Sequence, residues 1–126
     1  MTPEQFIAIV DDDAGVRQSA TNLFRSMGLK ARAFTSAEEF LSCGAVDDVS
    51  CLVLDVQMPG MGGLDLQSHL AAIDRHIPIV FVTGYPDDRV RTKAMQSGAV
   101  CFLTKPVETG DLLDGLRSAL TANDKE

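Results

Sequence analysis

The stretch CLVLD, residues 51–55, is a short apolar run that ends in a carboxylate. A carboxylate has little reason to follow a buried run unless a partner compensates its charge. Three other apolar runs lead to residues suited to phosphoryl chemistry: FIAIV before Asp11 and Asp12, IVFV before Thr83, and VCFLT before Lys105. The nearly unbroken runs at 6–10, 51–54 and 79–82 predict strands that are buried on both faces of a sheet.

Helical patterns follow the first strand and the short strand predicted at 30–34. Apolar residues recur at helical spacing from Ala14 to Met27, and Gly28 follows as a left-handed C-terminal cap. The SAEE sequence at 36–39 has the spacing of a capping box, which predicts a helix that runs to about Cys43. The polar stretch 44–50 is then expected to be a loop.

Three further helices are predicted in the second half of the chain. The turn-forming segment MPGMGG, residues 58–63, precedes a helix whose apolar positions run from Leu64 to Ile73. Another helix is capped by Asp87 or Asp88 and ends at Gly98. The last follows Lys105-Pro106 and carries inward-facing leucines, and the polar tail at 122–126 is expected to fray.

Five strands alternating with five helices, joined mostly by short connections, indicate right-handed βαβ units. We therefore predict an α/β fold with a parallel sheet covered by helices on both faces. Open sheets of this kind place their sites at the carboxyl ends of the strands. The acids, the hydroxyl and the ammonium group should converge there: Asp11, Asp12, Asp55, Thr83 and Lys105. Such a set suits a divalent metal together with a phosphoryl group.

Composition narrows the class of protein. The 126 residues fit one domain, and the net charge of −7 argues against binding to nucleic acid by this segment. Clustered carboxylates cost free energy unless a cation joins them, so the acidity suggests a metal.

Three widely spaced cysteines in apolar company indicate reduced thiols. No run is long enough to span a membrane and the N-terminus lacks an export pattern, so a cytoplasmic protein is expected.

Four motifs in order resemble bacterial two-component response regulator receiver domains (CheY-like): IVDDD at 9–13, LDVQMPGM at 54–61, VTG at 82–84 and FLTKP at 102–106. The segments 36–41, 55–64 and 94–100 are most similar to the FixJ subgroup. The resemblance implies a flavodoxin-like, doubly wound five-stranded parallel sheet of order 2-1-3-4-5 with five helices. It also implies a receiver domain at 1–121, with 122–126 as a polar tail or linker stub.

The resemblance implies that Asp55 accepts a phosphoryl group from the phosphohistidine of a sensor histidine kinase or phosphotransfer protein. Asp12 would be a direct metal ligand and Asp11 would act through a coordinated water. One oxygen of Asp55 and the backbone carbonyl of Gln57 would complete the protein ligands, and hard oxygen ligands favour Mg²⁺. On this reading the domain is a phosphoacceptor rather than an enzyme.

The same resemblance assigns the remaining site residues. Lys105 would pair with one phosphoryl oxygen and Thr83 would donate a hydrogen bond to another. Thr83 and the aromatic residue Phe102 would form the switch, and the bond from Lys105 to Pro106 is expected to be cis. The fourth helix, fifth strand and fifth helix would present the partner surface, including a phosphorylation-dependent homodimer.

Several alternatives stay open at the level of sequence. Asp11 and Asp12 could be a strand end and a helix cap, Thr83 an ordinary strand residue, and Lys105 a solvated surface lysine. An aspartate-nucleophile phosphatase would need a second acid at Gln57, and a flavin-binding domain would need a phosphate loop after the first strand. Within the receiver reading, the domain either controls transcription through a further DNA-binding domain or acts alone through protein contacts.

The loop at 84–88, GYPDD, departs from the pattern GHGDVP that is common in the FixJ subgroup. Gln57 and Tyr85 flank the position from which water would approach an acyl phosphate. We therefore hypothesise that the bulky Tyr85 slows hydrolysis of the phosphorylated form. His69 and His76 lack ligand spacing to each other and receive no role.

Overall fold

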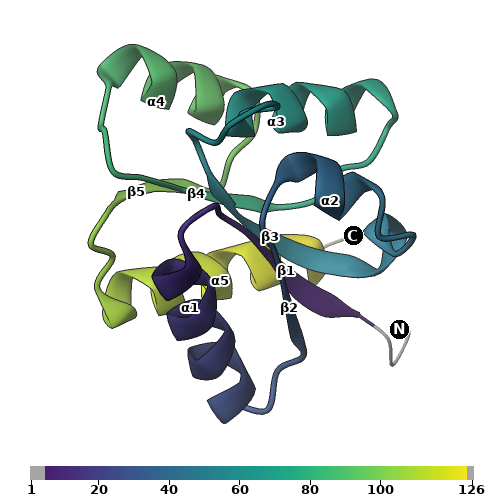
Figure 1. The fold of residues 1–126 in the computed structure, drawn as a ribbon, viewed down its shortest axis with the longest axis vertical. Helices are drawn as coiled ribbons and strands as arrows, with labels where there is room; N and C mark the ends of the chain where they lie inside the picture. Colours follow the sequence, from purple (N-terminus) through teal and green to yellow (C-terminus); the bar gives the residue numbers. More distant parts are fainter. Residues whose placement is uncertain (1–4, 125–126) are drawn as a thin grey trace.

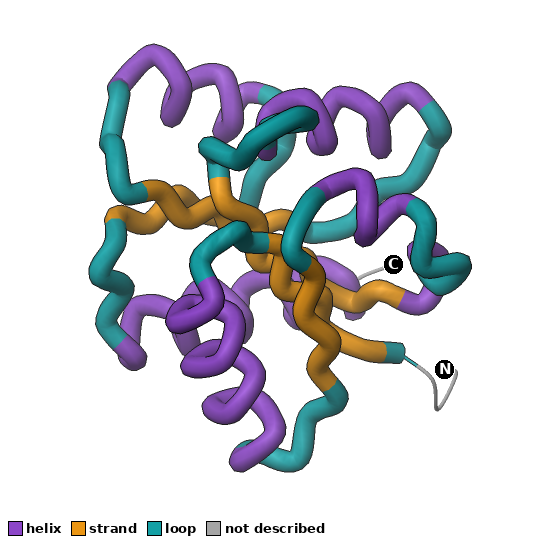
Figure 2. Tube along the Cα trace, viewed as in Figure 1, coloured by secondary structure: helices purple, strands orange, loops and turns teal. Residues whose placement is uncertain are grey.

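The computed structural model describes residues 5–124 and forms three layers, with a central sheet between two layers of helices (Figures 1 and 2). Helices α1 and α5 cover one face of the sheet, and α2, α3 and α4 cover the other. The elements in chain order are β1 (Phe6–Val10), α1 (Ala14–Ser26), β2 (Ala31–Phe34), α2 (Ala37–Leu41), the 3₁₀ turn η1 (Val46–Asp48), β3 (Val49–Asp55), α3 (Gly63–Ala72), β4 (Ile79–Thr83), α4 (Asp88–Gln96), β5 (Cys101–Thr104) and α5 (Thr109–Asp124).

The five strands form one parallel sheet in the order β2-β1-β3-β4-β5. This order confirms the predicted flavodoxin-like fold. It makes β1 and β3 neighbours, with Val10 beside Leu54, and it sets Asp55 at the end of β3 beside Val82 of β4. The strand order therefore brings together the ends of β1, β3 and β4, which carry the candidate site residues.

Alternation along the strands builds two hydrophobic cores, one on each face of the sheet. On β1, Phe6, Ala8 and Val10 face the core beneath α2, α3 and α4, whereas Ile7 and Ile9 face the core beneath α1 and α5. Every residue of β1, β3 and β4 except Ser50 is buried. These strands are thus covered on both faces, as their unbroken apolar composition predicts.

Helix ends follow the predicted signals. Gly28 takes φ +81° after α1, and Gly98 takes φ +103° after α4, a conformation that glycine adopts without steric cost. Of the two candidate caps for α4, the structure selects Asp87, whose carboxylate accepts the N–H groups of Arg89 and Val90. The peptide bond from Lys105 to Pro106 is cis, as the family resemblance implies.

Several boundaries differ from the sequence expectations, and α2 ends at Leu41 instead of about Cys43. The loop expected at 44–50 contains the 3₁₀ turn Val46–Asp48, and β3 begins at Val49, two residues before the apolar run. The early start matches the pairing of Val49 with Phe6 of β1, and the Ser50 hydroxyl donates to the Phe6 carbonyl across the sheet. Helix α5 continues to Asp124, so it includes 122–124 of the tail expected to fray, and 125–126 lie outside the described residues. In the described part of the chain, no helix has the length and apolarity to cross a bilayer.

Candidate functional site

The candidate site lies at the carboxyl edge of the sheet, where β1, β3, β4 and β5 end. Asp11 directly follows β1, Asp55 and Thr83 are the last residues of β3 and β4, and Lys105 directly follows β5. Asp11, Asp55 and Thr83 are almost fully buried, with 1%, 3% and 0% of their surface exposed. Buried polar side chains at one sheet edge must satisfy one another or bind a ligand, because burial without a partner is costly.

Lys105 is the cation that faces the two buried acids. Its Nζ lies 3.0 Å from Asp11 Oδ2 and 3.5 Å from Asp55 Oδ2, and it donates a hydrogen bond of 3.3 Å to Asp11 Oδ1. Burial would lower the pKa of Lys105, but the hydrogen bond and charge of Asp11 together with Asp55 outweigh it and raise the pKa. The ammonium group therefore stays charged at neutral pH and partly neutralises the acids.

Asp11 is held in place from three sides. Besides Lys105, its Oδ1 accepts the backbone N–H of Asp13 at 2.8 Å, and its backbone carbonyl accepts Arg17 Nη1 at 2.8 Å. Its buried Oδ2 accepts no hydrogen bond with acceptable geometry, although it lies close to Lys105 Nζ. A buried carboxylate oxygen in this state is suited to a further donor or cation. Arg17, one turn into α1, is a supporting residue that no sequence motif indicated.

Asp55 is electrostatically unfavourable in its charged form. Burial first, and then the negative charge of Asp11, raise the pKa of Asp55 to about 7 against the opposing attraction of Lys105. A side-chain hydrogen bond with Asp12 raises the pKa of Asp55 further. The backbone N–H of Gln57, which lies 3.3 Å from Asp55 Oδ1, lowers it. A carboxyl group with this balance gains from a divalent cation, which favours the ionised form.

Asp12 completes a group of three acids. One oxygen each from Asp11, Asp12 and Asp55 can be chosen so that all lie within 4.8 Å of one another. Asp12 is exposed, whereas the other two are buried. This arrangement gives a cation access from solvent on one side and fixed oxygen ligands on the other. Carboxylate oxygens are the ligands that Mg²⁺ and Ca²⁺ prefer.

A cavity of about 610 Å³ opens over these acids. It is lined by Asp12, Asp13, Asp55, Gln57, Met58, Pro59, Gly84, Tyr85 and Lys105. Tyr85 is 73% exposed at its rim. The structure thus places Gln57 and Tyr85 at one cavity with Asp55, which is the arrangement that the hydrolysis hypothesis requires.

The two expected switch residues lie on neighbouring strands. Thr83 Oγ1 accepts the backbone N–H of Tyr85 at 3.0 Å, so its hydroxyl proton remains for another acceptor. Phe102 on β5 is half-buried, and its ring centroid lies 6.2 Å from that of Phe81. Phe102 is therefore supported by the core on one side while part of its surface remains exposed.

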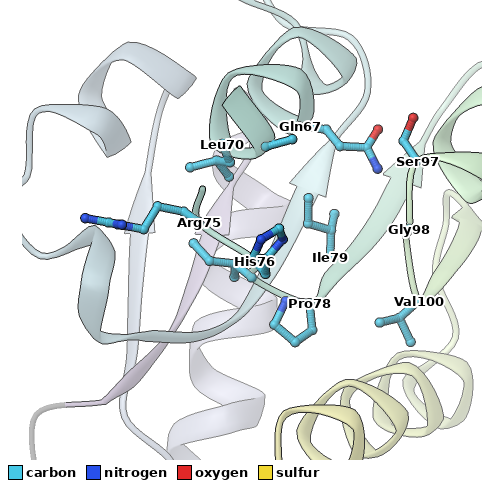
Figure 3. Close-up of a pocket in the computed structure, with 11 residues that line it drawn as sticks. Gln67, Leu70, Arg75, His76, Pro78, Ile79, Ser97, Gly98 and Val100 are labelled. Carbon is cyan, nitrogen blue, oxygen red and sulfur yellow. The ribbon is translucent and has the colours of Figure 1, made fainter. Parts of the chain in front are cut away.

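A second cavity, of about 250 Å³, lies at the opposite edge of the sheet, between the C-terminal parts of α3 and α4 (Figure 3). Gln67 extends toward α4, where its Nε2 donates to the Ala94 carbonyl at 3.1 Å. Arg75 and His76 at this cavity already pair with Asp47 and Asp74. Among residues 5–124, the one group of acids that could hold a metal is Asp11, Asp12 and Asp55 at the first cavity.

Besides Arg17, sequence reasoning missed a second contact that supports the site. Glu38 of α2 accepts the backbone N–H of Met61 at 2.9 Å, in the loop that joins Asp55 to α3. The sequence indicated Glu38 only as part of a capping motif. In that motif, Ser36 accepts the N–H of Glu39, and Glu39 reaches back to the N–H of Thr35.

Comparisons with known proteins agree with this geometry. The family described as "Response regulator receiver domain" matches residues 7–117. The chain is 50% identical over 113 residues to Nodulation protein W of Bradyrhizobium diazoefficiens, covering 90% of this chain and 50% of that protein. It is 38% identical over 114 residues to Transcriptional regulatory protein FixJ of Azorhizobium caulinodans, covering 90% and 54%. The chain thus spans about half the length of these relatives.

Solved structures show the same likeness. A low-resolution structure of the response regulator StyR superposes with a TM-score of 0.89 at 41% identity, covering 97% of this chain and 62% of that one. The crystal structure of FixJ-N gives a TM-score of 0.82 at 32% identity, covering 95% and 96%. The similarity to FixJ predicted from the sequence is confirmed. Its fold, its matched motifs and its relatives place the chain in the response regulator receiver family of two-component signalling systems.

Proposed function

We propose that the domain accepts a phosphoryl group on Asp55 from the phosphohistidine of a sensor histidine kinase or phosphotransfer protein. The observation that carries this proposal is the convergence of three carboxylates within 4.8 Å, with Lys105 Nζ within 3.5 Å of two of them. Receiver domains of two-component systems interact with such donors, and this chain belongs to that family. The domain acts as a phosphoacceptor that assists its own modification, rather than as an enzyme with a separate substrate.

The donor set fits Mg²⁺. We propose Asp12 as a direct ligand, Asp11 as a ligand through water, one oxygen of Asp55, and the backbone carbonyl of Gln57. The buried Oδ2 of Asp11, which accepts no hydrogen bond with acceptable geometry, and the raised pKa of Asp55 both support a cation at this place. When bound, Mg²⁺ supplies the positive charge that offsets the carboxylates and the phosphoryl oxygens.

The transfer step follows from the remaining residues. One carboxylate oxygen of Asp55 attacks phosphorus while the phosphorus–nitrogen bond of the donor breaks, and its electron pair returns to the imidazole, which takes up a proton. The product is an acyl phosphate on Asp55. Because phosphoryl transfer has a loose transition state, alignment and charge provide most of the catalysis. Lys105 pairs with one phosphoryl oxygen, and Thr83 donates its hydroxyl proton to another.

The response is a shift between two packings, in which Thr83 moves toward the phosphoryl group and Phe102 rotates inward. The half-buried ring of Phe102 beside Phe81 supports this role, because the inward position lies against an existing core. The shift alters the face formed by α4, β5 and α5, through which we propose partner binding, including homodimerisation. A ligand changes such an equilibrium only by binding one packing better than the other.

The output depends on the full-length protein. Because the chain covers about half of relatives such as the transcriptional regulatory protein FixJ, we propose that it belongs to a regulator of transcription. A stand-alone receiver that acts through protein contacts is the alternative. The receiver would comprise 1–121, and the net charge of −7 supports the proposal that this segment does not itself bind nucleic acid. Free Cys43, Cys51 and Cys101 suit the cytoplasm, which we propose as its location.

The proposal is tested by incubating the domain with acetyl phosphate and following the intact mass. Wild-type protein with Mg²⁺ should gain one base-labile phosphoryl group, and chelation of Mg²⁺ should prevent the gain. The Asp55→Asn variant should gain none under the same conditions, whereas Asp114→Asn, at an exposed position on α5, should behave like the wild type. Equal modification of the Asp55→Asn variant would remove the basis for assigning the acceptor.

A further inference from the structure

The loop between Asp55 and α3 is fastened to α2 by a side chain distant in sequence. Glu38 Oε2 accepts the backbone N–H of Met61 at 2.9 Å, although the two residues are 23 positions apart. The neighbouring Gly60 takes φ +78°, and a Cβ added there would lie 2.7 Å from the same carboxylate oxygen. Gly60 therefore serves both the turn of the loop and the close approach of Glu38.

The two ends of this loop are already fixed by contacts of its own. The N–H of Gln57 donates to Asp55 Oδ1 at 3.3 Å, and the N–H of Gly63 donates to the Val56 carbonyl at 2.8 Å. Between these two contacts, the backbone N–H of Met61 points to another element of the fold. Glu38 therefore fixes the middle of this loop at Met61. The first part of the same loop carries the Gln57 carbonyl.

We propose that Glu38 is a positioning residue for the metal site, which fixes the loop at Met61 so that the Gln57 carbonyl is preformed for Mg²⁺. The inference rests on the proposed function, because it concerns the same metal site. Outer residues that orient metal ligands contribute to affinity without touching the ion. Glu38 is not placed among the ligands, and it does not line the cavity over the acids.

The carboxylate form of Glu38 is the one suited to this contact. The hydrogen bond from Met61 lowers the pKa of Glu38, which keeps the side chain an anionic acceptor at neutral pH. Glutamine would keep an acceptor oxygen at the same length but lose the charge, whereas alanine would remove the acceptor altogether. These two substitutions therefore separate positioning of the loop from attraction of the cation by charge.

Glu39 provides a matched control on the same helix. Its carboxylate also accepts a backbone N–H, from Thr35 at 2.6 Å, and its pKa is lowered by that contact. Thr35, however, precedes α2 and does not belong to the loop after Asp55. Glu39→Ala should lower the stability of α2 by loss of its cap, without removing the contact between Glu38 and Met61.

The experiment measures Mg²⁺ affinity by isothermal titration calorimetry and the exchange rate of the Met61 amide by NMR, with the unphosphorylated chain. We expect Glu38→Ala to raise the Kd for Mg²⁺ by about 3- to 10-fold and to accelerate exchange at Met61, as for loss of an outer supporting contact. Glu38→Gln and Glu39→Ala should each remain within about 2-fold of the wild-type Kd, since neither removes the acceptor from the loop.

Each other result overturns the inference in a recognisable way. An unchanged Kd in Glu38→Ala means that the loop needs no support from α2. Equal weakening in Glu38→Ala and Glu38→Gln means that charge, and not position, matters, and equal weakening in Glu39→Ala points to general loosening of α2. Absence of Mg²⁺ binding by the wild type would instead overturn the proposed metal site, and the inference with it.

Discussion

Replacement of Asp55 by Asn in the metal-free domain should stabilise it, although the residue is the proposed acceptor. The ordinary pKa of the aspartate is 3.8, and burial and Asp11 raise it to about 7 in the folded state. Between these two values the folded protein binds more protons than the unfolded chain, so its stability falls as the pH rises. Above pH 7, the ionised carboxylate of Asp55 lowers the free energy of unfolding by the full amount. This loss is about 4 kcal/mol, because each tenfold change in proton affinity corresponds to about 1.36 kcal/mol.

The Asn variant lacks this destabilisation because its side chain carries no charge, and its amide N–H can donate to Asp11. At pH 8 we expect the variant to be more stable than the wild type by about 2 to 4 kcal/mol, which corresponds to about 1 to 2 M in the urea midpoint. At pH 5 the same linkage leaves an advantage of at most about 2 kcal/mol, because the folded-state carboxyl is then protonated.

Urea denaturation followed by far-ultraviolet circular dichroism at both pH values, with a chelator present, provides the measurement. Asp114→Asn is the control, because the side chain of Asp114 is 75% exposed and pairs with Arg117 on the surface of α5. That pair should contribute less than about 1 kcal/mol at either pH. A stability difference between Asp55→Asn and wild type that is the same at pH 5 and pH 8 would refute the electrostatic argument. So would a variant that is less stable than the wild type at pH 8.

Three further predictions concern other parts of the site. Gly63→Ala should destabilise the domain by about 3 kcal/mol or more, because its Cβ would overlap the carbonyl oxygen of Asp55; Gly110→Ala, where a Cβ meets no atom within 4 Å, should be neutral or stabilising by up to about 1 kcal/mol in the same thermal unfolding assay. Thr83→Ala should leave transfer from acetyl phosphate detectable by mass but weaken phosphorylation-dependent dimerisation in analytical ultracentrifugation, and undiminished dimerisation would contradict the coupling. Tyr85→Ala should shorten the lifetime of the acyl phosphate, measured by decay of the phosphorylated mass after donor removal; an unchanged or longer lifetime would show that the ring does not shield the site.

The convergence of the acids could be predicted because it depends on periodicity and topology alone. Asp55 ends an apolar run of strand length, and parallel strands bring their carboxyl ends to one edge whatever the details of packing. The neighbouring positions of Asp11 and Asp55 further depend on strand order, which the family resemblance supplied. Caps such as Gly28 and Asp87 are local signals, so they too could be located from the sequence.

The supporting contacts could not be predicted in the same way. The hydrogen bonds of Arg17 to Asp11 and of Glu38 to Met61 depend on which direction a long side chain takes from its helix, and tertiary packing decides that. The early start of β3 likewise involves a distant partner, since Val49 pairs with Phe6 of β1 and the Ser50 hydroxyl donates to the Phe6 carbonyl, 44 positions away. Sequence patterns record periodicity and local capping, whereas contacts decided by tertiary packing leave no pattern of their own.

The position of Lys105 suggests how phosphorylation could shift the equilibrium under the proposed function. In the unmodified site, its ammonium group is engaged with Asp11 and Asp55, and Asp55 remains unfavourable as an anion in spite of it. A phosphoryl group brings oxygens that compete for the same ammonium group, so Lys105 must give up part of its contact with Asp11. Thr83 needs no such exchange, because its hydroxyl proton is not used in the bond with Tyr85. The free energy for switching would therefore arise mainly from the new contacts of Lys105 and Thr83 with the phosphoryl oxygens, and Thr83 would convert them into movement on β4.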